Sequence, residues 1–201
     1  MIAGTTAGLV LAAGLGRRFG GGDKLLADFR GQPLIRLAAR AALDGGLAPV
    51  VVVLGPDDEA RRKALDGLSP LTFLVNPSPE NGMGSSLALG ITALMEAKVS
   101  GGAAVLLADM PLVTGNHVAR LRRHFESGGA RNILAPSVQG RRGHPVFWPN
   151  DLWPDLAGLA GDRGGRDSLN RNAARLELVE LADDGVLVDV DRPSDLLDLR
   201  S

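Results

Sequence analysis

The sequence has no cysteine, no long apolar run and almost no net charge, and each absence excludes a class of protein. Without cysteine the chain cannot form disulfides, thiolate metal sites or a cysteine nucleophile, and the lack fits a reducing compartment. A formal net charge of −1 provides no bulk attraction to a polyanion or to a lipid surface. Neither nucleic acid nor membrane is therefore expected as a partner.

The apolar segments are also too short for a membrane protein. None approaches the roughly 20 residues that cross a bilayer. The first residues lack the early basic region of a signal peptide, and their apolar stretch runs directly into glycines and arginines. A cytoplasmic location is the expectation that follows.

What the sequence has instead is an alternation of short apolar runs with helical patterns. This alternation predicts βαβ units and a mainly parallel sheet within one domain over residues 1–201. The predicted strands are 7–13, 50–54, 71–75, 103–108, 133–135, 176–181 and 186–190. The predicted helices are 34–43, 85–97, a helix from a Thr114 cap through Phe125, a piece centred on Trp153, and 193–200.

Open parallel sheets bind ligands where the carboxyl ends of their strands meet. The first predicted strand is followed by a glycine-rich loop, 14–23, and the strand 103–108 is followed by Asp109. Asn76 follows a third strand, and Asp189 lies near the end of the last one. We expect these segments to meet at one edge of the sheet.

The glycine-rich loop is suited to phosphate. Residues 11–20 read Leu-Ala-Ala-Gly-Leu-Gly-Arg-Arg-Phe-Gly, and Lys24 follows. Glycines let backbone N–H groups approach an anion, while Arg17, Arg18 and Lys24 add positive charge that suits a triphosphate. A flexible loop with a solvated basic flank explains the same residues equally well, so the pattern alone leaves both interpretations open.

Two well-known phosphate motifs do not match this loop. A P-loop lysine follows glycine and precedes serine or threonine, whereas Lys24 stands between Asp23 and Leu25. The dinucleotide fingerprint places a third glycine where this chain has Phe19.

Acidic residues follow two of the predicted strands. Asp109 comes directly after the strand 103–108, and alternation within 186–190 directs Asp189 and Asp191 to the same face. Mg²⁺ binds proteins through one or two carboxylates together with water and phosphate oxygens. Taken singly, Asp109 also fits a turn, and Asp191 fits the N-cap of the last helix.

Several segments together resemble one superfamily, the nucleotidyltransferases. The loop 11–20, Lys24 and the Gly-Gln-Pro-Leu-Ile at 31–35 resemble its opening signature. The Ala-Asp-Met-Pro at 108–111 resembles its metal-binding segment, and residues 188–196 resemble its closing motif. The resemblance covers nearly the whole chain and implies a Rossmann-like three-layer αβα sandwich of the nucleotide-diphospho-sugar transferase type.

The resemblance also implies roles for individual residues. In the superfamily the loop wraps a triphosphate and the lysine contacts phosphate, so Lys24, Arg18 and Asp109 are the expected catalytic residues. Asp109 and Asp191 are the expected Mg²⁺ ligands, with Asp189 as the alternative to Asp191. Arg192 stands where a threonine is commoner, which changes the local hydrogen bonding.

Four further segments narrow the resemblance to the MobA-like branch and its molybdenum cofactor cytidylyltransferases. Residues 81–87 resemble a Gly-Met-Ser-Ser-Ser-Leu segment of that group, with Gly84 in place of a serine. Residues 140–145 and 161–166 resemble its Gly-His-Pro and Gly-Asp-x-Gly-Ala-Arg segments. The Ala-Ala-Gly that contains Ala13 matches the cytidylyl form, whereas guanylyltransferases carry Ala-Gly-Gly.

The expected activity is transfer of CMP from CTP to a molybdopterin-type phosphorylated acceptor with release of pyrophosphate. The alternatives are another acceptor (a sugar phosphate or methylerythritol phosphate), GTP as donor, or a non-catalytic nucleotide-binding chaperone. A molybdenum hydroxylase or its chaperone is the implied downstream partner. The expected nucleotide-binding residues are Leu11, Ala12, Ala13, Gly14, Gly16, Arg17, Arg18, Lys24, Asn81, Gly82, Ser85 and Ser86. The expected acceptor-binding residues are Arg141, Arg142, Gly143, His144, Pro145, Asp162, Arg163 and Arg166, with His144 fitting a structural role equally well.

Overall fold

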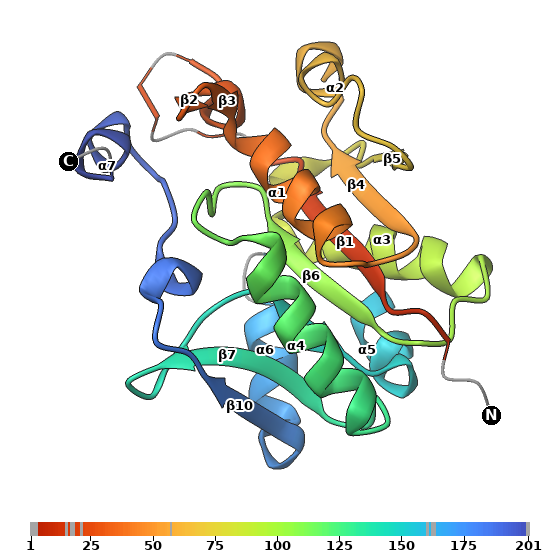
Figure 1. Cartoon of the computed structure of the whole chain (residues 1–201). Coiled ribbons are helices and arrows are strands. Elements are labelled where there is room, and N and C mark those ends of the chain that lie inside the picture. Colours follow the sequence, from red (N-terminus) through yellow and green to blue (C-terminus); the bar gives the residue numbers. More distant parts are fainter. Residues whose placement is uncertain are drawn as a thin grey trace.

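The computed structural model of the chain contains a mixed sheet with the strand order β10-β7-β9-β6-β1-β4-β5 (Figure 1). The structure describes residues 4–14, 16, 19–20, 22–56, 58–159, 161 and 164–199. The sheet strands are β1 (Ala7–Ala12), β4 (Val50–Leu54), β5 (Thr72–Val75), β6 (Ala103–Leu107), β7 (Ile133–Val138), β9 (Val146–Trp148) and β10 (Leu176–Glu180). β8 (Arg141–Arg142) pairs with β7, and β2 (Asp28–Phe29) and β3 (Gln32–Pro33) form a separate small ribbon.

Four of the six neighbouring pairs along this strand order are parallel, which agrees with the mainly parallel sheet that the sequence predicts. β1 lies between β4 and β6 and is parallel to both, whereas β9 runs antiparallel to β6 and β7. Every residue of β1 and β4 is buried. Their uninterrupted aliphatic sequences therefore reflect a sheet that is covered on both faces.

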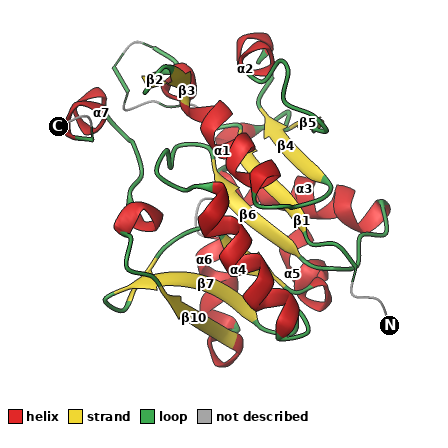
Figure 2. Ribbon diagram, viewed as in Figure 1, coloured by secondary structure: helices red, strands yellow, loops and turns green. Residues whose placement is uncertain are grey.

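Helices cover both faces of the sheet and complete three layers (Figure 2). On one face α1 (Leu34–Asp44), α2 (Glu59–Ala64) and α4 (Gly115–Ser127) contribute to one hydrophobic cluster. On the other, α3 (Met83–Glu96), α5 (Trp153–Ala157) and α6 (Gly164–Arg171) contribute to a second. The expected αβα sandwich is confirmed. No helix in the described part of the chain is long and apolar enough to span a membrane.

One predicted strand is wrong. Residues 186–190 do not join the sheet; a 3-10 helix covers Asp184–Leu187, and an extended segment leads from it to α7 (Pro193–Asp198). The backbone of this segment bonds elsewhere: Val186 O accepts from His144 N, and Val190 N donates to Asp109 O, both at 2.9 Å. The alternation of apolar residues therefore reflects burial of Val186 and Val190 rather than strand pairing.

We expect Phe147→Ala to lower the free energy of unfolding by about 3–5 kcal/mol, because it opens a cavity in the core. The Phe147 side chain is fully buried, and its ring centroid lies 5.4 Å from that of Phe125. Met95→Ala, at a 40% exposed position on α3, should shift it by less than about 0.5 kcal/mol. Urea denaturation measures both, and equal shifts would contradict the packing described here.

Candidate functional site

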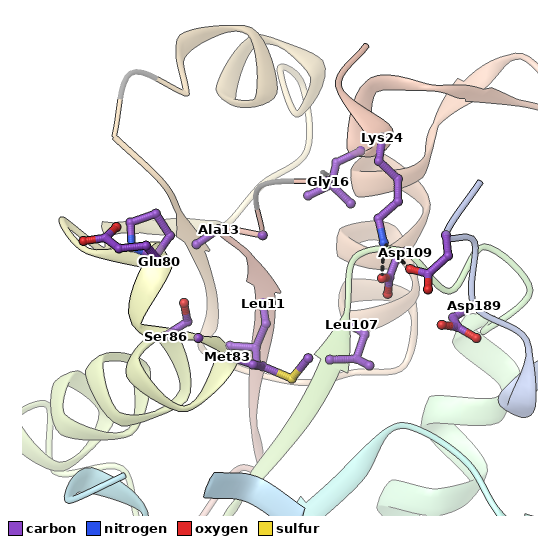
Figure 3. Close-up of a pocket in the computed structure, with 15 residues that line it drawn as sticks. Leu11, Ala13, Gly16, Lys24, Glu80, Met83, Ser86, Leu107, Asp109 and Asp189 are labelled. Atoms are coloured by element: carbon purple, nitrogen blue, oxygen red, sulfur yellow. Dashed lines mark hydrogen bonds and ion pairs between the residues drawn. The ribbon is translucent and has the colours of Figure 1, made fainter. Parts of the chain in front are cut away.

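A pocket of about 450 Å³ opens where β1 and β6 end (Figure 3). Four chain segments converge there: the glycine-rich loop with Lys24, the segment that begins α3, the end of β6, and the segment before α7. The lining residues are Leu11, Ala13, Gly14, Gly16, Lys24, Leu25, Pro79, Glu80, Gly82, Met83, Ser86, Leu107, Asp109, Asp189 and Asp191.

Lys24 lies at the centre of the charged end of the pocket. Its Nζ donates to Asp109 Oδ2 at 2.7 Å and to Asp191 Oδ1 at 3.3 Å, as the dashed lines in Figure 3 show. Gly16, with φ of +56°, lies against the Lys24 side chain, and a Cβ there would stand 3.3 Å from Lys24 Cβ. The left-handed turn at Gly16 therefore favours glycine both by its backbone angle and by this close approach.

Backbone contacts bring the two carboxylates together from opposite halves of the chain. Asp109 follows β6, and its carbonyl oxygen accepts from Val190 N at 2.9 Å. Asp195 in α7 then accepts from the N–H groups of Asp191 and Arg192, both at 2.8 Å. These two hydrogen bonds lower the pKa of Asp195 below its usual value and fix the backbone that carries Asp191.

The carboxylates of Asp109 and Asp191 stabilise the positive charge on Lys24. Burial lowers the pKa of Lys24, but the attraction of Asp109 and Asp191 outweighs that effect, so the net shift is upward from 10.5. Lys24 therefore remains an ammonium at neutral pH. Its contribution to stability is present below pH 10.5 and is lost only as the pH rises through the raised pKa.

The same carboxylates fit a cation. Asp109 Oδ1 is buried and makes no hydrogen bond within the described residues, while Oδ2 of the same carboxylate holds Lys24. Asp109 and Asp191 already share one ammonium, so they lie close enough to share one cation. The described residues form no cluster of three or more histidine, aspartate or glutamate side chains that would hold a metal alone. The donor set thus fits a divalent cation that takes its remaining ligands from phosphate and water.

At the opposite end of the pocket, Asn76 organises the start of α3. Its side chain is buried, and Nδ2 donates to Ser85 Oγ and Ser86 Oγ, both at 2.9 Å, while Oδ1 accepts from Ser78 N. Ser86 lines the pocket, but Ser85 does not; its hydroxyl donates to Gly82 O at 2.8 Å.

Most of the predicted nucleotide-binding residues that the structure describes line this pocket, and three do not. Ala12 is buried, with its carbonyl turned to Arg61; Asn81 accepts from Gly161 N; and Ser85 supports Gly82. Arg17, Arg18, Asp162 and Arg163 lie outside the described residues.

Five lining residues were not predicted as site residues: Leu25, Pro79, Glu80, Met83 and Leu107. A sixth, Asp189, was predicted only as the alternative metal ligand to Asp191. Glu80 and Met83 flank Asn81 and Gly82, which were predicted to bind nucleotide. This adjacency in the sequence is what could have indicated them.

None of the predicted acceptor residues that are described is among the residues that line the pocket. Arg141 and Arg142 are exposed on β8, and Arg166 is exposed on α6. Gly143 packs so closely on the Val186 carbonyl that a Cβ would lie 2.2 Å from its oxygen. Pro145 is buried beside it.

His144 is bonded through its backbone to the segment that precedes α7. Its backbone N–H donates to Val186 O at 2.9 Å. Burial lowers the pKa of His144 to about 4, the positive charge of Arg142 adds to the shift, and Asp109 and a backbone hydrogen bond with Val105 offset it only in part. The imidazole is therefore neutral at pH 7, which fits a structural role.

This neutral imidazole predicts an acid-sensitive fold. A folded pKa of about 4 against an unfolded value of 6.5 means that stability is full above pH 6.5 and falls towards pH 4. Between pH 7 and pH 4.5, wild type should lose about 2 to 3 kcal/mol more than His144→Gln. Urea denaturation at both pH values measures the difference; equal losses would show that His144 is not kept neutral by its surroundings.

The fold and the pocket together define a nucleotidyltransferase. The family comparison gives the next step: residues 8–176 match the model described as the MobA-like NTP transferase domain, and the chain belongs to this family.

Individual relatives carry different names. The chain is 34% identical to nicotine blue oxidoreductase of Paenarthrobacter nicotinovorans over 92% of this chain and 91% of that protein. It is 34% identical to a probable molybdenum cofactor guanylyltransferase of Natronomonas pharaonis over 74% and 71% of the two chains. The crystal structure of Rv0371c from Mycobacterium tuberculosis superposes with a TM-score of 0.80 at 27% identity, covering 99% and 98%. Another structure of that protein is a complex with manganese, at a TM-score of 0.67, 23% identity and 89% of each chain.

Proposed function

We propose that the chain is a single-domain cytidylyltransferase that transfers CMP from CTP to the terminal phosphate of a molybdopterin-type acceptor. The observation that carries the proposal is an ammonium, Lys24, shared by Asp109 and Asp191 beside a glycine-lined end of one pocket. The name of the Natronomonas relative supports a molybdenum cofactor as acceptor. The product would pass to a molybdenum hydroxylase or its chaperone.

The reaction needs two anions to meet. An oxygen of the acceptor phosphate attacks the α-phosphorus of CTP, the bond between the α- and β-phosphates breaks, and pyrophosphate leaves with the bonding electrons. Lys24 turns from the carboxylates to the triphosphate and binds its negative charge. A divalent cation such as Mg²⁺, held by Asp109 and Asp191, would screen the remaining charge between the two substrates. Positioning and electrostatics then account for catalysis, without a covalent intermediate.

The choice of Asp191 over Asp189 as second cation ligand rests on the contact with Lys24. Both aspartates line the pocket, but the structure joins Asp191 Oδ1 to the lysine ammonium that Asp109 also holds. A cation that replaced the ammonium would meet the same two carboxylates.

Ala13 supports CTP as the donor. It is one of the residues that line the pocket, at a position where the guanylyl form has glycine. We expect the additional methyl group to leave less room for the base, which favours a pyrimidine over the larger guanine. GTP is the alternative donor, since the Natronomonas relative is named a guanylyltransferase.

We expect Lys24→Ala and Asp109→Ala each to reduce turnover by about 10²- to 10³-fold, because each removes a charge that acts on the phosphates. Lys63→Ala, on the exposed side of α2, is the matched control and should retain turnover. Circular dichroism checks that each variant is folded. Unchanged turnover in either site variant would remove the basis of the proposal.

The substrates are tested by measuring Mg²⁺-dependent pyrophosphate release. Wild type should release pyrophosphate with CTP and molybdopterin cofactor, more slowly with GTP, and not with the nucleotide alone. Release with methylerythritol phosphate or a sugar phosphate would assign another acceptor. Nucleotide binding without release would indicate a non-catalytic chaperone.

Reduction is a second candidate, favoured by the name of the Paenarthrobacter relative. The glycine-rich loop offers it little support, because Phe19 replaces the third glycine of the dinucleotide fingerprint. Consumption of NADH or NADPH in the presence of nicotine blue measures this activity directly, and we expect none.

A further inference from the structure

Arg61 is a buried arginine behind the glycine-rich loop. It projects from α2, is only 7% exposed, and its guanidinium makes five hydrogen bonds. Nε and Nη2 form a bidentate pair with the Asp23 carboxylate at 2.6 and 3.1 Å. Nη1 donates to Ala12 O at 2.6 Å and Asp58 Oδ2 at 3.0 Å, and Nη2 donates to Gly14 O at 3.0 Å.

These contacts use the whole donor capacity of the side chain. A guanidinium carries five N–H groups, and here each has an acceptor within the chain. Arg61 also does not line the pocket. It therefore acts on a bound nucleotide through the residues it holds.

Arg61 holds both ends of the loop that carries the pocket glycines. Gly14 is at one end and Asp23 at the other, and one guanidinium joins them. Asp23 Oδ1 also accepts from Leu25 N at 2.9 Å, which caps the 3-10 turn Lys24–Leu26. Asp23 therefore fixes the start of the turn that carries Lys24.

Arg61 also contacts the end of β1, at the last residue that pairs with β4. The carbonyl oxygen of Ala12 accepts a hydrogen bond from Arg61 Nη1. The N–H of Gly55, which follows β4, donates to Asp58 Oδ2 at 2.6 Å. The carbonyl oxygens of Ala12 and Gly14 both accept from the Arg61 guanidinium, so their negative ends face the arginine on α2. In a trans peptide the next N–H points the opposite way, which directs the Ala13 N–H away from Arg61.

We infer that Arg61 is a positioning residue for the triphosphate. Resting on the proposed function, this inference assigns Arg61 three effects: it fixes both loop ends, turns two carbonyl oxygens away from the phosphates, and neutralises Asp23 and Asp58. Without the guanidinium, two carboxylates stand uncompensated next to a polyanion site. Loss of Arg61 then weakens triphosphate binding more than it slows the chemical step.

The test compares Arg61→Gln with Arg62→Gln. Arg62 is the neighbour on α2, loses the same charge, and stacks on the Phe73 ring at 4.4 Å instead of contacting the loop. We expect Arg61→Gln to raise the Kd for Mg·CTP and for inorganic tripolyphosphate, measured by calorimetry, about ten-fold or more. It should raise the KM for CTP to a similar extent and change kcat by less than about three-fold. Arg62→Gln should leave all four quantities unchanged.

Asp23→Asn/Arg61→Gln separates positioning from a failure to fold. This double variant lacks the unpaired Asp23 carboxylate, so it should recover part of the lost affinity for tripolyphosphate. Arg61→Lys keeps the charge but cannot reproduce the fork of five donors, so it should be intermediate. Circular dichroism and melting curves identify the folded fraction of each variant. A variant that merely loses folded protein would show a lower kcat with unchanged KM and Kd.

Each outcome decides the inference. Equal affinities of folded wild type and Arg61→Gln for tripolyphosphate would overturn it, as would wild type that binds neither CTP, GTP nor tripolyphosphate. Wild type that binds these probes but releases no pyrophosphate with any acceptor would refute the proposed function alone. The comparison of Kd values would then still decide the role of Arg61.

Discussion

The meeting of Lys24 with Asp109 and Asp191 depends on the adjacency of β1 and β6. Because these strands are parallel neighbours, the loop after one and the aspartate after the other emerge at the same edge. The hydrogen bond from Val190 N to Asp109 O then brings the last part of the chain to this edge. A charged triad is thus assembled from three distant segments by one strand pairing and one backbone contact.

Two basic residues lie near the loop and are suited to different tasks. Lys24 carries a compact charge on a flexible stem, and among the described residues two side chains hold it, so it can exchange partners when phosphate arrives. Arg61 has a planar fork whose five donors are all engaged, so it cannot exchange them without breaking the loop support. One cation is therefore mobile towards the substrate, and the other is a fixed part of the framework.

The sequence predicted the strands best where burial alone determines them. The run 50–54 matches β4 residue for residue, because five consecutive aliphatic residues, four of them valine, are typical of a strand covered on both faces. The segment 186–190 has a similar pattern, but its backbone partners, His144 and Asp109, lie far away in sequence. Arg61 was missed for the same reason: Glu-Ala-Arg-Arg-Lys-Ala looks like a solvated helix, and its partners Asp23 and Ala12 are 38 and 49 residues distant.

Backbone hydrogen bonds join the proposed acceptor segments to segments that line the pocket, which bears on how two substrates are aligned. Gly161 exchanges two hydrogen bonds with the nucleotide segment, from Gly84 N and to Asn81 O, both at 2.9 Å. His144 N bonds to Val186 O, within the segment that leads to Asp191. The proposed acceptor segments therefore share backbone contacts with the proposed nucleotide and cation segments. In-line transfer requires a fixed angle between attacking and leaving oxygens, and such shared contacts fix it without depending on long, flexible side chains.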